Sequence, residues 1–190
     1  MNGNVKSVDY RKVGSTEVFV VDGLFSESIL KRLHLQLQVA GYSLCSATSN
    51  ASTEWNETMT ELDVEDFVSD EFGRILVSEV NALNIDRRHL NASKVLVNSI
   101  RSGDVSFVHK DSDKDSEYSV LVYVNPLWEE DWAGETIFYD TQSEPVTAVS
   151  FRPGRVVIFP SKVLHRAGIQ MSTCQDFRYT LSIRMHACNG

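Results

Sequence analysis

The sequence predicts an α+β fold that is mainly β, with helices in the first half of the chain and a β-roll in the second. Apolar residues recur at helical spacing up to residue 83, and after Leu90 the spacing changes to alternation. Turn residues separate the alternating runs, a pattern typical of an all-β sandwich or jelly roll. No Pro- or Ser-rich linker divides the halves, so we expect the 190 residues to form a single domain.

The first expected elements are a strand and a helix. Residues 17–21, E-V-F-V-V, form a short apolar run that the Asp22-Gly23 turn ends. Ser26 is a suitable N-cap for a helix over roughly residues 27–39, which would pack one face on a sheet. The apolar positions at helical spacing are Ile29, Leu30, Leu33 and Leu37.

A polar stretch and a second helix follow. Residues 42–63 are rich in Ser, Thr and Asn, which predicts a loop or an irregular strand pair. Trp55 is the large side chain in this stretch, and it would either line a substrate pocket or pin the loop to the core. Residues 64–83 have helical spacing and predict a helix that is broken near Gly73.

The second half of the chain offers eight strand candidates. Gly, Pro, Asn and Asp stand between most of them, as expected of short strands joined by turns. The candidates are residues 93–101, 104–110, 117–125, 135–140, 145–151, 155–159, 163–169 and 177–186.

Charge and composition limit the possible functions. The net charge of −8 disfavours a nucleic-acid partner, because phosphates bind to basic surfaces. Cys45, Cys174 and Cys188 are unpatterned and odd in number, which is typical of reduced thiols. The first residues lack the apolar segment of a signal peptide, and no run of eighteen apolar residues could span a membrane. We therefore expect a cytoplasmic protein without a membrane partner, whose oligomeric state is unknown.

One short motif suggests a metal site. Residues 105–111, V-S-F-V-H-K-D, read as the end of a strand, so His109 and Asp111 would project from the same face. His165 follows the apolar run at residues 156–159 and offers a third ligand. Two imidazoles and one carboxylate form the 2-His-1-carboxylate triad of non-haem iron(II) oxygenases. A lone H-x-D is common by chance, however, and does not establish the site alone.

The acidic run after His109 allows two other interpretations. Asp113 shares the predicted strand face with Asp111 and is the alternative carboxylate ligand. The run D-S-D-K-D-S-E also suggests calcium, but Ser116 and Val122 stand where an EF-hand loop needs Gly and Glu. We therefore expect a solvated loop that follows one true ligand.

The last predicted strand has two different faces. Arg178, Thr180, Ser182 and Arg184 share one face, and the other face is apolar. Two arginines inside a β-roll are costly unless an anion pairs with them, and a guanidinium binds a carboxylate in a bidentate way. A bound dicarboxylate would satisfy an inward face, whereas an outward face would leave both arginines in solvent. The strand alone favours neither arrangement.

Four segments in the same order resemble the 2-oxoglutarate/Fe(II)-dependent oxygenases, and among them the prolyl-4-hydroxylase-like branch. Residues 98–111 resemble the strand, glycine turn and H-x-D motif of that family. Residues 118–140 are similar to its Y-L-N, W and G-G-E-T segment, and residues 153–167 to its P-G, F and H run. Arg178-Tyr-Thr180 resembles its R-x-S/T signature. The resemblance covers about residues 93–187, half of the chain.

The resemblance implies a double-stranded β-helix, a cupin-like jelly roll, over residues 93–187. Residues 1–92 would supply a strand and the helices that support this dioxygenase core. The resemblance also implies that His109, Asp111 and His165 bind Fe(II) and form the catalytic centre.

The co-substrate of this family is 2-oxoglutarate, and the resemblance implies which residues bind it. Arg178 would bind its distal carboxylate with help from Thr180, and Tyr123 would be a further contact. Arg184 is placed like an arginine near the co-substrate in the nucleic-acid demethylase branch. Asn98 is a further candidate contact.

The expected reaction is hydroxylation of an unactivated C–H bond with dioxygen, releasing succinate and carbon dioxide, with ascorbate as a supporting reductant. Halogenating relatives have a small residue in place of Asp111, so its carboxylate predicts hydroxylation rather than halogenation. The branch suggests a prolyl residue of a peptide, or a free amino acid, as the substrate. Candidate substrate contacts at the open mouth of the roll are Trp55, Arg101, Trp128, Trp132 and Arg166.

Two other classes of function compete with the oxygenase. A non-catalytic β-roll that binds a small carboxylate or a sugar through the same arginines would need no iron and form no succinate. A cupin-type metalloenzyme without 2-oxoglutarate, such as an isomerase, would bind its metal independently of Arg178. The triad together with the Arg178-x-Thr180 pattern favours the oxygenase.

Overall fold

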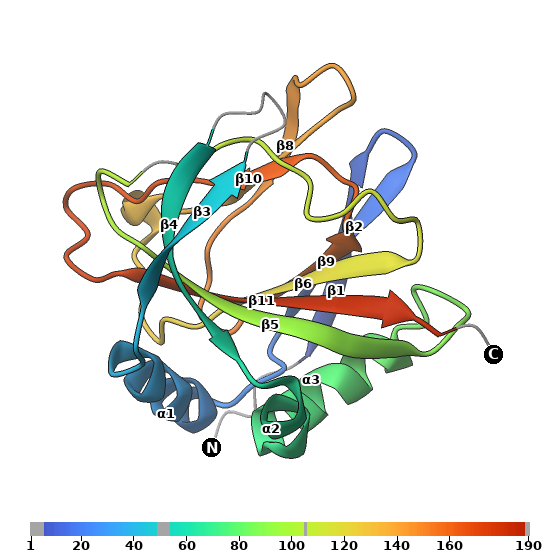
Figure 1. The fold of residues 1–190 in the computed structure, drawn as a ribbon, viewed down its shortest axis with the longest axis horizontal. Coiled ribbons are helices and arrows are strands. Elements are labelled where there is room, and N and C mark those ends of the chain that lie inside the picture. Colours follow the sequence, from blue (N-terminus) through green and yellow to red (C-terminus); the bar gives the residue numbers. More distant parts are fainter. Residues whose placement is uncertain (1–5, 49–53, 105, 189–190) are drawn as a thin grey trace.

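The computed structural model describes residues 6–48, 54–104 and 106–188, and two antiparallel sheets form its framework (Figure 1). The larger sheet has eight strands in the order β1-β2-β9-β6-β11-β5-β4-β3, and the smaller has three in the order β10-β7-β8. The strands of the larger sheet are β1 (Ser7–Val13), β2 (Thr16–Asp22), β3 (Ser43–Thr48), β4 (Glu54–Leu62), β5 (Leu90–Ile100), β6 (Glu117–Tyr123), β9 (Val156–Pro160) and β11 (Arg178–Ala187). The strands of the smaller sheet are β7 (Thr136–Tyr139), β8 (Pro145–Val149) and β10 (His165–Ala167).

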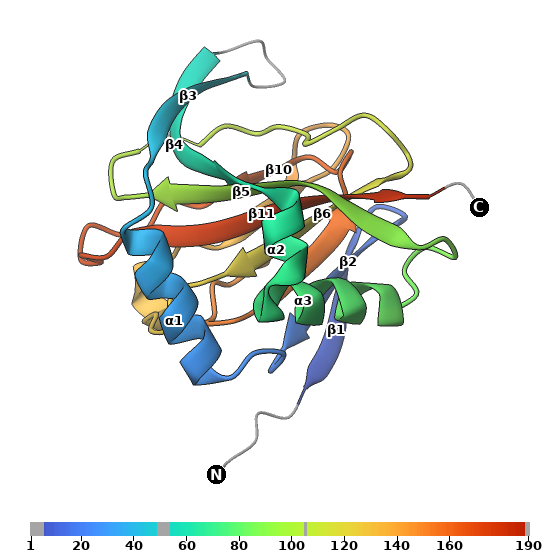
Figure 2. The same cartoon turned by 60° about the horizontal axis from the view of Figure 1, so that its bottom comes forward.

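Three helices lie together against one face of the larger sheet (Figure 2). They are α1 (Glu27–Gln38), α2 (Val64–Ser69) and α3 (Glu71–Ala82), and a single 3₁₀ turn, η1 (Glu130–Trp132), precedes β7. Ser26 caps α1 as predicted, because its side chain accepts a hydrogen bond from the N–H of Ile29. The predicted break in the second helix is real, but it lies at Asp70 rather than at Gly73. Asp70 is extended, ends α2, and caps α3 by accepting from the N–H of Phe72.

Two hydrophobic layers fix the position of the larger sheet. Its outer face packs against the helices through the buried side chains Leu30, Leu37, Phe67, Phe72, Leu76, Val80, Val95, Val97, Val120, Val122, Ile158, Leu181, Ile183 and Met185. Part of its inner face packs against the smaller sheet through Val18, Val20, Leu121, Tyr123, Phe138, Val149, Phe151, Val157, Phe159 and Val163. The remainder of the inner face is free to hold a polar site.

Several predicted elements differ from the observed ones. The predicted strand at residues 104–110 is wrong, because the described residues 104 and 106–110 form only one isolated bridge, between His109 and His165. Residues 42–63 contain the regular hairpin β3–β4, which continues the larger sheet beyond β5. The strand β1 was not predicted, since its residues are exposed except for Val13 and its apolar alternation is limited to Val8 and Tyr10.

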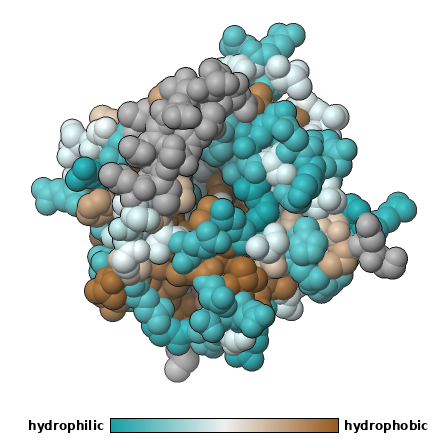
Figure 3. All heavy atoms as spheres, in the orientation of Figure 1, coloured by the Kyte–Doolittle hydropathy of each residue, from teal (hydrophilic) through white to brown (hydrophobic). Residues whose placement is uncertain are grey.

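The surface has separate hydrophobic and hydrophilic areas. On the face shown in Figure 3, hydrophobic atoms gather in the lower half, near α1 and α2, and the upper right is hydrophilic. Among the described residues, no helix has both the length and the apolar character needed to cross a membrane.

The packing of α2 against α3 predicts an unusual response to Gly73→Ala. Alanine normally stabilises a helix by about 1 kcal/mol relative to glycine. At Gly73 an added Cβ would lie 1.9 Å from the carbonyl oxygen of Phe67, so the two helices must move apart. We expect Gly73→Ala to lower the free energy of unfolding by roughly 1–3 kcal/mol in urea titrations. Gly41→Ala is the control, because its Cβ would meet nothing within 4 Å; equal effects of the two changes would contradict the prediction.

Candidate metal centre and co-substrate pocket

The isolated bridge brings two histidines of distant segments together. His109 lies in the connection between β5 and β6, and His165 begins β10. The N–H of His109 donates to the carbonyl of His165 at 2.9 Å, and the N–H of His165 donates back at 3.0 Å. The centroids of the two imidazole rings are consequently only 4.5 Å apart.

Hydrogen bonds to the chain orient both imidazoles. The Nδ1 of His109 lies 2.9 Å from the carbonyl oxygen of Phe107, and the Nδ1 of His165 lies 3.0 Å from that of Val163. A carbonyl can only accept, so each Nδ1 carries a hydrogen, and Nε2 is the ring atom left to bind a metal. A second hydrogen bond of this kind is usual for histidines that bind metals.

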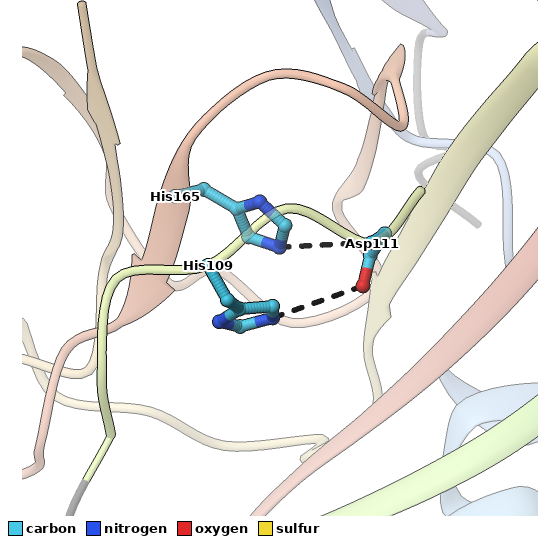
Figure 4. A group of neighbouring side chains, drawn as sticks. All are labelled: His109, Asp111 and His165. Atoms are coloured by element: carbon cyan, nitrogen blue, oxygen red, sulfur yellow. Dashed lines mark ion pairs between the residues drawn. The ribbon is translucent and has the colours of Figure 1, made fainter. Parts of the chain in front are cut away.

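Both Nε2 atoms point toward the carboxylate of Asp111 (Figure 4). The Nε2 of His109 is 3.7 Å from one carboxylate oxygen, and the Nε2 of His165 is 3.7 Å from the other. One ligand atom from each of the three residues lies within 4.8 Å of the other two. The set of two imidazole nitrogens and one carboxylate oxygen fits iron(II) and leaves coordination positions open for other ligands.

Their surroundings keep His165 neutral and Asp111 ionised, the forms in which these side chains can bind a metal. Burial lowers the pKa of His165 to about 4, so its ring is neutral at pH 7. Burial by itself would raise the pKa of Asp111, but the nearby His165 and the guanidinium of Arg184 outweigh it and hold that pKa below its usual range. The Nη2 of Arg184 forms an ion pair with Asp111 at 3.0 Å.

The alternative ligand Asp113 is not placed at this site. Its side chain is 85% exposed and pairs with Lys110 at 2.9 Å. Asp115 is equally exposed and pairs with Lys162. The acidic run after Asp111 is therefore a solvated loop whose carboxylates pair with lysines.

A cavity of about 390 Å³ opens beside the three candidate ligands. Its floor is the inner face of β11, β5 and β4, and the connection from β5 to His109 lies along its side. It is lined by Thr58, Met59, Leu96, Asn98, Ser99, Ile100, Arg101, Gly103, Asp104, Ser106, His109, Asp111, Leu121, Thr136, His165, Ala167, Arg178, Thr180 and Ser182. Several of these, such as Thr136 and Asp104, were missed because no spacing rule links them to the H-x-D motif.

Arg178 is a buried cation at one side of the cavity. It is 2% exposed and donates to the carbonyl of Gly134 at 2.8 Å and to the hydroxyl of Thr180 at 2.7 Å. Within the described ranges no carboxylate lies at ion-pair distance from it; Glu135 acts on it from farther away, and burial lowers its pKa. A buried charge without a counter-ion is costly, so this side of the cavity suits an anionic ligand. The polar face of β11 is thus the inner face.

The other predicted co-substrate contacts lie at different depths. Asn98 lines the cavity, and its Oδ1 is buried without a hydrogen-bond partner. Tyr123 is fully buried behind the cavity lining, where its hydroxyl donates to Thr136 at 2.7 Å and Arg178 lies over its ring. Arg184 contacts Asp111 rather than lining the cavity, and its Nη1 is also buried without a partner.

The five predicted substrate contacts are not gathered in one place. Arg101 lines the cavity mouth, with a side chain that is 69% exposed and paired with Asp104. Trp55 belongs to β4, but its side chain falls outside the part of the chain that the structure describes. Trp128, Trp132 and Arg166 do not line the cavity.

Packing explains where these last three residues lie. Trp128 stacks on Phe151 with ring centroids 4.1 Å apart, and Trp132 packs edge-on against Trp128. Arg166 donates to the hydroxyl of Tyr139 at 2.6 Å. Sequence patterns identified large or charged residues near the mouth but could not tell packing from an inward position.

A family model described as the 2OG-Fe(II) oxygenase superfamily matches residues 87–186. This range contains all three candidate ligands and the whole polar face of β11. No curated protein sequence matches the chain significantly.

Solved structures show the same fold. A 2OG-Fe(II) oxygenase family oxidoreductase from Burkholderia pseudomallei has 13% sequence identity and a TM-score of 0.68, covering 91% of this chain and 86% of its own. A prolyl-4-hydroxylase from Pseudomonas putida has 12% identity and a TM-score of 0.61, covering 93% and 95%. A prolyl hydroxylase from Trichoplax adhaerens, in complex with a hypoxia inducible factor peptide, has 18% identity and a TM-score of 0.59, covering 98% and 85%. The predicted double-stranded β-helix is confirmed by these likenesses, which at such identities concern the fold alone.

The pKa of His165 predicts how the metal-free protein responds to acid. The unfolded chain takes up this proton near pH 6.5, whereas the folded protein resists it until about pH 4. Folding is therefore opposed increasingly as the pH falls from 6.5 toward 4, by at most about 3 kcal/mol. Urea titrations at pH 7.5 and 4.5 should show a smaller loss of stability in His165→Gln than in the wild type. Parallel losses would show that the buried imidazole does not resist protonation.

Proposed function

Because the chain belongs to the 2OG-Fe(II) oxygenase superfamily, we propose that it hydroxylates an unactivated C–H bond in a reaction that consumes 2-oxoglutarate and dioxygen. The observation that carries this proposal is the position of a buried, unpaired arginine beside a 2-His-1-carboxylate set in one cavity. Neither feature alone needs a co-substrate. Together they fit a ligand that has a carboxylate at one end and metal-binding oxygens at the other.

In this proposal His109, Asp111 and His165 hold iron(II). Iron with 2-oxoglutarate bound would supply the oxidising chemistry: one oxygen atom of dioxygen ends in succinate as carbon dioxide leaves, and the other is transferred to the substrate. Ascorbate would keep the iron reduced. The neutral imidazole of His165 and the ionised carboxylate of Asp111 have no proton to release when the metal binds at pH 7.

Arg178 and Thr180 would bind the distal carboxylate of 2-oxoglutarate. The guanidinium is already fixed by Gly134 and Thr180, so little side-chain entropy is lost when the anion arrives. Tyr123 would support Arg178 from behind. The Oδ1 of Asn98 would accept a hydrogen bond from a donor on a ligand in the cavity, because this oxygen is otherwise unsatisfied.

The proposed substrate is a prolyl residue of a peptide or a free amino acid. Similar folds are found in prolyl hydroxylases of bacterial and animal origin, one of them solved with a peptide. The apolar side chains of Met59 and Ile100 line the cavity and suit a pyrrolidine ring or an aliphatic side chain. Arg101 at the mouth is the candidate contact for a polar or charged part of the substrate.

Turnover of 2-oxoglutarate tests this proposal most directly. We expect slow succinate formation by the wild type with iron(II) and ascorbate, measured by NMR, and a stimulated rate when a prolyl peptide or an amino acid is accepted. His109→Ala should abolish it, and Arg178→Ala should raise the KM for 2-oxoglutarate by about 100-fold, since a buried charge-assisted contact is lost. Arg32→Ala on α1 is the control arginine and should change neither value, because it pairs with Glu71 at the surface.

Other outcomes would favour the competing functions. Metal binding that is unaffected by Arg178→Ala, without succinate formation, would indicate a cupin-type metalloenzyme. Binding of a carboxylate or a sugar without any iron requirement would indicate a non-catalytic roll.

The carboxylate of Asp111 also predicts the type of product. Because this ligand occupies a position that a halide would need, mass spectra of reactions with an accepted substrate in chloride or bromide should show addition of oxygen only. Halide incorporation by the wild-type protein would contradict the prediction.

A further inference from the structure

Two buried serines form a hydrogen-bonded pair behind Asp111. Ser119 lies in β6 and Ser161 directly follows β9, and both are 0% exposed. The hydroxyl of Ser119 donates to the Oδ2 of Asp111 at 2.5 Å, and the two hydroxyls are 2.9 Å apart. Since the proton of Ser119 is directed to the carboxylate, Ser161 is the donor in the contact between the serines. The pair is therefore a one-way chain of donors that ends on Asp111.

Backbone hydrogen bonds also connect Ser161 to Asp111. The carbonyl of Ser161 accepts from the N–H of Asp111 at 2.9 Å and from the N–H of Ser112 at 3.2 Å. The N–H of Ser161 donates to the carbonyl of Glu117 at 2.9 Å. These bonds attach the irregular segment that carries Asp111 to the end of β9. The backbone and the side chain of Asp111 are thus fixed by the same residue, directly and through Ser119.

The other oxygen of the carboxylate has a separate partner. The Nη2 of Arg184 in β11 lies 3.0 Å from Oδ1 in an ion pair, so each oxygen of Asp111 faces a different partner. A carboxylate offers about four acceptor positions, so these two partners leave room for a metal ion. They also oppose rotation of the group, because another rotamer would leave the buried hydroxyl of Ser119 without its acceptor and would lengthen the ion pair.

We propose that Ser119 and Ser161 are positioning residues that fix Asp111 in its metal-binding orientation before the metal arrives, with Ser161 acting through Ser119. The inference rests on the proposed function, since it takes Asp111 to be a ligand of iron(II). Partners of metal-binding side chains commonly contribute 10- to 100-fold to metal affinity. Without Ser119 the carboxylate is free to turn fully toward Arg184, and binding of the metal must then reverse that movement.

Metal titration of the metal-free protein tests the role of Ser119. Cobalt(II), added in air, and iron(II), added under anaerobic conditions, are the probes, with affinity measured by calorimetry and cobalt geometry by visible absorption. Ser119→Ala should weaken both metals about 10- to 100-fold and alter the cobalt spectrum. Ser119→Thr keeps the hydroxyl and should stay close to wild type.

Tyr118→Phe is the matched control. It removes a hydroxyl-to-carboxylate hydrogen bond, to Asp86 at 3.1 Å, from the neighbouring residue of the same strand, but on the opposite face. We expect Tyr118→Phe to leave metal affinity unchanged. Thermal unfolding of the metal-free variants shows whether each one is folded at the temperature of the titration.

The Ser119→Ala/Ser161→Ala double variant tests whether Ser161 acts on Asp111 through Ser119. Ser161→Ala should weaken the metal severalfold in the wild-type background but not in the Ser119→Ala background, because Ser161 has no route to Asp111 once Ser119 is gone. Equal losses of metal affinity in both backgrounds would show that Ser161 does not act through Ser119. Wild-type affinity in folded Ser119→Ala would overturn the positioning role while leaving the proposed function intact. Failure of the wild type to bind either metal would overturn both.

Discussion

The two-sided strand β11 is the constraint on which the rest of the structure depends. It pairs with β5 along one edge and with β6 along the other, so both of its edges are hydrogen-bonded and its register is fixed from two sides (Figure 1). Leu181, Ile183 and Met185 are 0% exposed and attach the sheet to the helices. The alternation that buries these residues forces Arg178, Thr180 and Ser182 into the interior of the roll. A one-residue slip of β11 would destroy the core and the site together.

Burying polar side chains inside the roll costs free energy, and nearby groups offset part of that cost through hydrogen bonds and an ion pair. Arg178 uses a backbone carbonyl and a threonine hydroxyl, and Arg184 uses the carboxylate of Asp111. These contacts satisfy some of the buried donors but leave Arg178 without a counter-ion and the Oδ1 of Asn98 without a donor. These two unsatisfied groups indicate what the cavity can bind. A ligand that brings an anion and a hydrogen-bond donor would offset the free-energy cost of burying them.

The geometry of the candidate metal centre comes from an irregular segment rather than from a strand. His109 and Asp111 were expected on one face of a strand at residues 104–110, yet only one bridge pair forms there. The bridge to His165 and the bonds to Ser161 replace the missing ladder and give the same juxtaposition. The i and i+2 spacing therefore predicted a pair that the structure does bring together, although no ladder of strand hydrogen bonds holds it there.

The sequence by itself determined the mainly β character, the positions of most strands, the cap of α1 and the identity of the three residues that the structure brings together. It could do so because alternation, turn residues and an N-cap are local properties. Only the tertiary structure decided that the polar face of β11 points inward, that Tyr123 lies behind Arg178, and that Trp128 packs on Phe151 rather than facing the cavity. It alone joined Ser119 and Ser161 to Asp111. These relations depend on which distant segments pair across the sheets, and no spacing along the chain encodes that choice.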